Sequence, residues 1–106
     1  MIINGFPMGG GGDIEMKYAT GTSGNVINVT GLDFKPQSIF IYGYWYNAGS
    51  YHAWGNLMFN GDEILNQTSG YSAGGMSMSN ISVLDDGFTV TMSASQFSFT
   101  WHALGY

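Results

Sequence analysis

The chain has 106 residues, which fits one domain, and its charged side chains are limited to two lysines and seven carboxylates, for a net charge of −5. Two cations cannot form the basic surface that phosphate contacts require, so we expect no binding to nucleic acid or to an anionic membrane. The sequence has no cysteine, which excludes a disulfide framework, a cysteine-based metal site and a thiol nucleophile.

The first residues differ in composition from the rest. Residues 1–12 read MIINGFPMGGGG. Because consecutive glycines lose much backbone entropy on ordering, we interpret residues 9–12 as a hinge and the residues before it as a flexible or docking arm; a frayed terminus is the alternative. No basic segment precedes the apolar residues, so we expect no signal peptide, and no apolar run is long enough to span a membrane. Residues 13–106 are expected to form a single β-sandwich domain.

The first half of this domain is predicted to contain three strands, because β-branched and aromatic residues recur without helical spacing. They are expected over residues 14–20, 26–30 and 37–47. The third is apolar on both faces, where Ile39, Ile41 and Trp45 alternate with Phe40, Tyr42, Tyr44 and Tyr46. A strand that is apolar on both sides is expected at a sheet–sheet interface or at a subunit interface.

A hairpin is predicted around Asn60-Gly61, between strands over residues 52–59 and 62–65. Asn-Gly supplies the two positive-φ positions of a type I′ turn. The following stretch, residues 68–78, is rich in serine and glycine and is predicted to be a surface loop.

The last three strands are predicted over residues 81–83, 88–92 and 97–104, where apolar and polar residues alternate. Because the links between them are short and polar, we expect a three-stranded antiparallel meander. Seven to eight short strands at near-even spacing predict an all-β fold, either an antiparallel β-sandwich or a small knob-like barrel.

No motif in the sequence indicates catalysis or metal binding, so we predict no enzyme activity, no catalytic residues, no metal and no cofactor. The acid pairs Asp62-Glu63 and Asp85-Asp86 are typical of turns, and neighbouring side chains point apart, so neither predicts a two-carboxylate site. His52 and His102 are distant in sequence, and nothing indicates a third zinc ligand.

Aromatic residues are concentrated in one stretch, which is the candidate ligand-binding region. It contains Tyr42, Tyr44, Trp45, Tyr46, Tyr51 and Trp54, with Asn47, Ser50 and His52 between them. Flat aromatic faces with hydrogen-bonding tips suit sugar rings, and they also suit protein interfaces. We select as candidate saccharide-binding residues Tyr44, Tyr46, Tyr51, His52 and Trp54. Core packing, favoured for Trp45, and a subunit interface are the alternatives.

Three other stretches carry a family resemblance. They are residues 29–36 (VTGLDFKP) leading into residues 38–41 (SIFI), residues 85–90 (DDGFTV), and the ending at residues 99–106 (FTWHALGY). Together they resemble the small C-terminal β domains of bacteriophage tail and receptor-binding proteins, of tail-fibre or baseplate type. The resemblance covers about residues 20–106.

The resemblance implies a virion tail component, made in the host cytoplasm, with a β-sandwich or knob-like head. It also implies a homo-oligomer, with a trimer favoured, that contacts other virion tail proteins and recognises a host-surface saccharide or teichoic acid. It supplies no binding motif that transfers to this chain. The leading hypothesis is a non-enzymatic phage tail or adsorption protein. The alternatives are a purely structural tail or baseplate component and, with less support, a small carbohydrate-active enzyme.

Overall fold

The computed structural model describes residues 15–106, which form eight β-strands and no helix. The strands are β1 (Lys17–Ser23), β2 (Val26–Val29), β3 (Pro36–Tyr46), β4 (Ser50–Asn60), β5 (Glu63–Tyr71), β6 (Met78–Leu84), β7 (Gly87–Met92) and β8 (Ser98–Gly105). The prediction of an all-β fold with seven to eight strands is therefore confirmed. The arm and hinge predicted over residues 1–12 lie outside the described residues.

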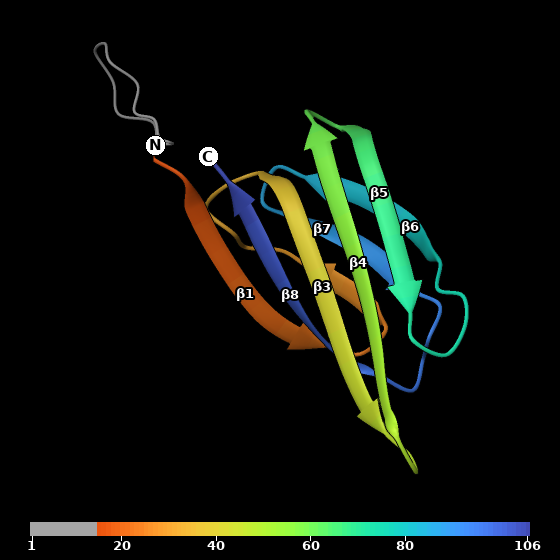
Figure 1. Ribbon diagram of the computed structural model, residues 1–106. Coiled ribbons are helices and arrows are strands. Elements are labelled where there is room, and N and C mark those ends of the chain that lie inside the picture. Colours follow the sequence, from red (N-terminus) through yellow and green to blue (C-terminus); the bar gives the residue numbers. More distant parts are fainter. Residues whose placement is uncertain (1–14) are drawn as a thin grey trace.

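The strands form two antiparallel sheets that face each other as a β-sandwich (Figure 1). One sheet has five strands in the order β1-β8-β3-β4-β5, and the other has three in the order β2-β7-β6. Strands from the two ends of the domain are neighbours in both sheets, since β1 pairs with β8 and β2 with β7. The β3–β4 hairpin extends past the other strands at the end of the sandwich away from the C-terminus (Figure 1).

The predicted three-stranded meander is wrong in its last strand. β6 and β7 pair as expected, but β8 lies in the other sheet, between β1 and β3. The link between β7 and β8 crosses the sandwich, and it buries Ala94 and Phe97 on the way. Because these two side chains belong to the core, the chain passes from one sheet to the other here and does not fold back beside β7.

The hairpin predicted around Asn60 is present, but its turn lies one residue later. Asn60 pairs with Glu63, which leaves Gly61 and Asp62 as the two loop residues. Only Gly61 has a positive φ, of 62°. A glycine at the first loop position is typical of a type II′ turn, so the expected type I′ turn is corrected.

The second strand of this hairpin is longer than predicted. β5 continues to Tyr71, so residues 68–71, predicted as part of a loop, belong to a strand, and the loop is confined to residues 72–77. β5 is the edge of its sheet and is exposed over most of its length. An edge strand held by backbone pairing on one side needs little apolar alternation, which is why the sequence does not predict the full length of β5.

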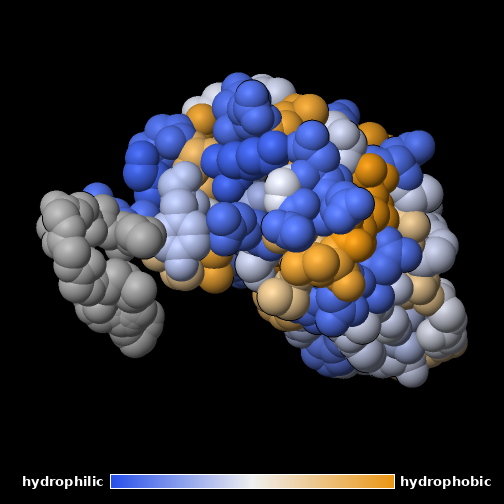
Figure 2. Space-filling view, turned by 90° about the horizontal axis from the view of Figure 1, so that it is seen from above, coloured by the Kyte–Doolittle hydropathy of each residue, from blue (hydrophilic) through white to orange (hydrophobic). Residues whose placement is uncertain are grey.

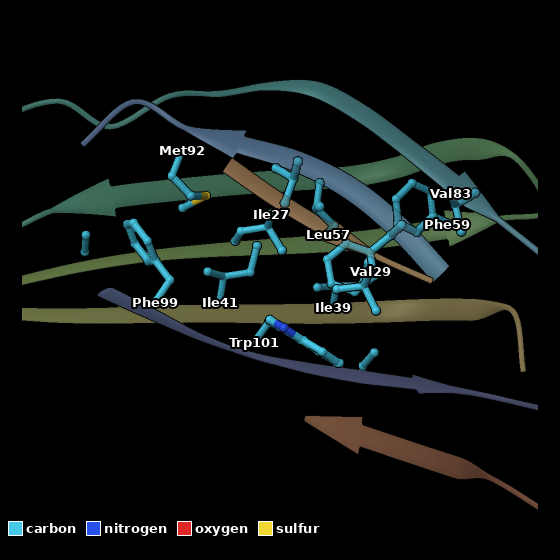
Figure 3. Packing of buried hydrophobic residues seen from close by; sticks show 14 of the residues in the cluster. Ile27, Val29, Ile39, Ile41, Leu57, Phe59, Val83, Met92, Phe99 and Trp101 are labelled. Atoms are coloured by element: carbon cyan, nitrogen blue, oxygen red, sulfur yellow. The ribbon is translucent and has the colours of Figure 1, made fainter. Parts of the chain in front are cut away.

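The core lies between the two sheets and is almost entirely hydrocarbon (Figure 3). Ile27, Ile41 and Phe99 are fully buried, and no buried residue among those described is polar or charged. Aromatic rings join the sheets: Phe88 of β7 meets Trp101 of β8 edge to face, with ring centroids 5.4 Å apart. The two sheets therefore hold together through packing and without buried ion pairs.

The two faces of β3 have different surroundings. Ile39 and Ile41 face the second sheet and are buried, which confirms the predicted sheet–sheet interface for that side. Trp45 is half-buried against the core, as expected. Phe40 and Tyr44 point to the opposite side and are 40% and 48% exposed. No other part of the described chain covers this outer face.

Candidate functional site

Four of the five candidate residues selected from the sequence lie together on the outer face of the five-stranded sheet. Tyr44 and Tyr46 of β3 share this face because they are two residues apart. His52 of β4 is directly opposite Tyr44, and Trp54 is directly opposite Tyr42. Residues in opposed positions of an antiparallel pair are in side-chain contact distance, so the β3–β4 pairing unites these four side chains.

Tyr51, the fifth candidate, lies on the inner face and is separated from the others. Its ring centroid is 5.3 Å from that of Trp45 and 6.4 Å from that of Tyr71. Phe97 completes this inner aromatic cluster through edge-to-face contacts with Trp45 and Tyr71. Tyr51 therefore supports the extended β3–β4 hairpin from within and does not share a surface with His52.

The outer face also carries aromatic residues that the sequence analysis did not select. Tyr18 of β1, Phe40 and Tyr42 of β3, and His102 of β8 lie there beside the four predicted residues. The eight outward rings are called the aromatic band, and its members are Tyr18, Phe40, Tyr42, Tyr44, Tyr46, His52, Trp54 and His102. The alternation of β3 is a sufficient signal for Phe40 and Tyr42. Tyr18 and His102 join the band through pairings of β8 that the sequence does not reveal.

Each histidine of the band is held by a tyrosine from a neighbouring strand. The Tyr42 hydroxyl hydrogen-bonds to His52 Nδ1 at 2.5 Å, and the Tyr18 hydroxyl hydrogen-bonds to His102 Nδ1 at 2.6 Å. Within residues 15–106 neither imidazole has another side-chain hydrogen bond, so Nε2 of each ring is left for a ligand or water. The pairs fix the orientation of four rings before any ligand arrives.

Ring–ring contacts join six rings of the band into two groups of three. His102 stacks between Tyr18, at 5.9 Å, and Phe40, at 6.1 Å. His52 lies 5.9 Å from Tyr42 and 5.2 Å from Tyr44, measured between ring centroids. The Tyr44 hydroxyl is 3.0 Å from Ser50 Oγ, which gives that ring a second support. Rings ordered in this way lose little side-chain entropy on binding a partner.

Trp54 lies across the neighbouring strand. Gly70 of β5 is opposite Trp54, and a Cβ atom at position 70 would collide with the indole ring. One face of the indole therefore rests on the glycine backbone, while the residue stays 38% exposed. Glycine at position 70 lets the indole lie flat on the sheet, and a flat indole offers its other face for stacking.

The outer face is almost free of charge, because the lysines and most carboxylates lie elsewhere. Because Lys17 is adjacent to Tyr18, which faces outward, the Lys17 side chain lies on the opposite side of β1. It forms an ion pair with Asp33 at 3.3 Å. Lys35 lies at the end of the sandwich that carries the β4–β5 turn, and it pairs with Asp62 at 2.6 Å and Asp85 at 3.6 Å. Figure 2 looks onto this end and shows hydrophilic residues gathered over it.

Lys35 joins the turns of the two sheets electrostatically. Its hydrogen bond to Asp62 raises the pKa of Lys35 above the usual 10.5, and the nearby charge of Asp85 acts in the same direction. Asp86 of the same turn accepts a hydrogen bond from the Gly31 backbone amide at 3.1 Å. Three acidic residues that the sequence analysis assigned to turns thus hold together the polar end of the domain.

The described residues contain no group of three histidine, cysteine or acidic side chains close enough to hold a metal ion. The same residues include no helix that is long and apolar enough to cross a membrane. The distinctive chemistry of residues 15–106 is therefore the uncharged aromatic band.

A scan against protein-family models and a search of curated proteins found no match to the chain, and no solved structure matched it. The geometry of the aromatic band and the resemblance carried by three short stretches of sequence are the two grounds for a functional proposal.

Proposed function

We propose that the chain is a non-enzymatic bacteriophage tail or adsorption protein that recognises a host-surface saccharide through the outer face of its five-stranded sheet. The observation that carries the saccharide part is the aromatic band, with its pre-oriented rings and its lack of charge. The tail-protein part rests on the sequence resemblance alone.

The band has the two kinds of group that bind sugars. The C–H faces of a sugar ring stack on flat aromatic faces such as the indole of Trp54. Sugar hydroxyls need donors and acceptors, and the tyrosine hydroxyls and the Nε2 atoms of His52 and His102 supply both. The supporting hydrogen bonds lie within the protein, so binding requires little further ordering of these side chains.

The electrostatics favour a neutral saccharide over a teichoic acid. Teichoic acids carry phosphate groups, and lysine or arginine normally pairs with them. Both lysines of the chain form ion pairs with carboxylates away from the band, and the chain has no other lysine or arginine. With a net charge of −5, the protein repels a polyanion at long range.

The main alternative is a structural tail or baseplate component, in which the band packs against another virion protein or a further copy of the chain. It is supported by the number of large apolar residues exposed on one face, which include Tyr18, Phe40, Tyr44 and Trp54. Patches of this kind often mark protein interfaces. A trimer remains the expected assembly from the resemblance, and light scattering on a sizing column would measure the mass of the assembly.

An array of bacterial surface glycans, both neutral and phosphate-bearing, tests the proposal. We expect the wild-type protein to bind neutral glycans without releasing reducing sugar, and Tyr44→Ala/Tyr46→Ala to lose that binding with a nearly unchanged midpoint of thermal unfolding. Val26→Ala is the control, because Val26 is an exposed apolar residue of β2 in the other sheet. Wild-type protein that binds no glycan on the array would refute the saccharide function, and unfolding of the double variant would place Tyr44 and Tyr46 in the structural framework.

A further inference from the structure

We infer that the aromatic band binds a linear, uncharged glycan chain of several sugar units across two half-sites, and not a single terminal sugar. This inference rests on the proposed saccharide function and specifies the ligand of the same site. The first half-site comprises Tyr18, His102 and Phe40. The second comprises Tyr42, Tyr44, His52 and Trp54.

The two half-sites repeat one arrangement on different strands. In each, a tyrosine hydroxyl binds Nδ1 of a histidine on the adjacent strand, and a ring of β3 packs on the same imidazole. The first uses β1, β8 and β3, and the second uses β3 and β4. Each half-site therefore offers ring faces beside an available imidazole Nε2, which is enough to engage one or two sugar units.

Phe40 of the first half-site and Tyr44 of the second are too far apart to be contacted by one sugar ring. Phe40 and Tyr44 are four residues apart on β3, which places them about 13 Å apart along the strand. Tyr42 lies between them on the same face, so the surface stays aromatic over that distance. A ligand that contacts Phe40 and Tyr44 together must therefore be a chain.

The register of the sheet shows the direction in which such a chain lies. Tyr18 pairs with Leu104 and therefore lies one outward-facing position before Phe40, counted along β3. His52 pairs with Tyr44 and therefore lies one outward-facing position after Tyr42. The band consequently runs diagonally from β1 at the end near the C-terminus to the β3–β4 hairpin (Figure 1). A glycan on this path touches strands that are far apart in sequence.

Neutral polar side chains border the band on both sides. Thr100 of β8 and Thr22 of β1 are paired with each other on one side. Asn56 of β4 and Thr68 of β5 are paired with each other on the opposite side. These hydroxyl and amide groups can meet the hydroxyls along both edges of a glycan chain, and none of them carries a charge that would require an anionic or cationic ligand.

Two linked half-sites make affinity depend on the length of the glycan. Once one half-site is occupied, the other meets the same chain at high effective concentration, which raises affinity by roughly 100-fold when the geometry permits both contacts. Short fragments are expected to occupy either half-site weakly and independently. Chains that reach both are expected to bind tightly, one per protein chain.

The test uses size-graded oligomers of the linear glycan that binds most strongly on the array, prepared by partial acid hydrolysis. Titration calorimetry would measure affinity and stoichiometry for the wild-type chain and for Phe40→Ala, Tyr44→Ala and the control Val26→Ala. We expect wild-type affinity to rise about 100-fold with oligomer length. Either half-site variant should abolish that rise while still binding short oligomers, and Val26→Ala should match the wild type.

Four outcomes would overturn the inference. Affinity that is independent of length, or a Phe40→Ala variant that binds long oligomers like the wild type, refutes the two half-sites and leaves the saccharide function standing. If the wild-type protein forms a homo-oligomer in solution and Phe40→Ala dissociates it, the aromatic band is assigned to contact with a second copy of the chain. Absence of binding to every array glycan refutes the saccharide function itself.

Discussion

The two faces of the five-stranded sheet are both rich in aromatic residues, yet they differ in the chemistry of those residues. Phe99 and Trp101 of β8 and Ile41 of β3 face the second sheet and are buried. Tyr42 and His102, on the same two strands, face outward, and they hydrogen-bond to His52 and Tyr18, respectively. Burying a polar group without a partner is costly, so hydrocarbon rings occupy the covered face and rings with polar tips the open one.

The difference between the faces predicts unequal responses to the loss of a ring. Phe99→Ala should lower the free energy of unfolding by about 3–5 kcal/mol, because it removes a fully buried ring and leaves a cavity. Phe40→Ala, on the outer face, should lower it by about 1 kcal/mol or less. Urea denaturation measures the loss of unfolding free energy in both variants. A similar loss for Phe40→Ala would mean that the outer face is itself covered in solution.

Gly70→Ala tests whether the outer face depends on a flat indole. The added Cβ must displace the Trp54 ring, which has open space on its outward side, so we expect a loss of stability of about 1 kcal/mol and glycan binding about tenfold weaker. Acrylamide quenching of tryptophan fluorescence should increase as the indole leaves the sheet. Gly75→Ala is the matched control, because a Cβ there meets no neighbour. Unchanged quenching and binding in Gly70→Ala would show that the orientation of the indole has no part in recognition.

Lys35→Gln examines the charged end of the sandwich, which contrasts with the neutral outer face. Because the pKa of Lys35 is raised in the folded state, its pairing with Asp62 contributes fully below pH 10.5 and is lost as the pH rises through the raised pKa. We expect Lys35→Gln to be slightly less stable than the wild type at neutral pH and equal to it in strongly alkaline solution. The Lys35 side chain is one-third exposed, so we expect this loss of stability to be smaller than those of Phe99→Ala and Gly70→Ala. Thermal unfolding at both pH values measures it, and glycan binding should not change; weaker binding would contradict the assignment of recognition to the uncharged band.

Much of the fold follows from local patterns in the sequence. The alternation of apolar and polar residues predicts β7 and β8, a run of β-branched and aromatic residues predicts β3, and Gly61 marks the hairpin between β4 and β5. The full length of the edge strand β5 escapes prediction because its exposed residues need no alternation. The destination of β8 also escapes, since a short link can fold a strand back or carry it across the core with the same residues.

The candidate site could also be predicted only in part, because local alternation shows which residues of one strand share a face and does not show which strands are neighbours. Alternation places Tyr44 and Tyr46 on one face, and the adjacency of Tyr51 and His52 is enough to send these two to opposite faces. Nothing in the sequence joins Tyr18 to His102, because their contact depends on the pairing of β1 with β8, 84 positions apart in the chain.

The sequence by itself determines that the chain is a small, weakly charged β protein with aromatic residues concentrated around β3 and β4. These properties are fixed by composition and by a repeat of two residues, which act locally. The tertiary structure alone decides that the aromatic band spans β1, β8, β3 and β4 and that Tyr51 supports the hairpin from within. Strand order and register depend on which faces can be buried together across the whole domain, and that condition is not local.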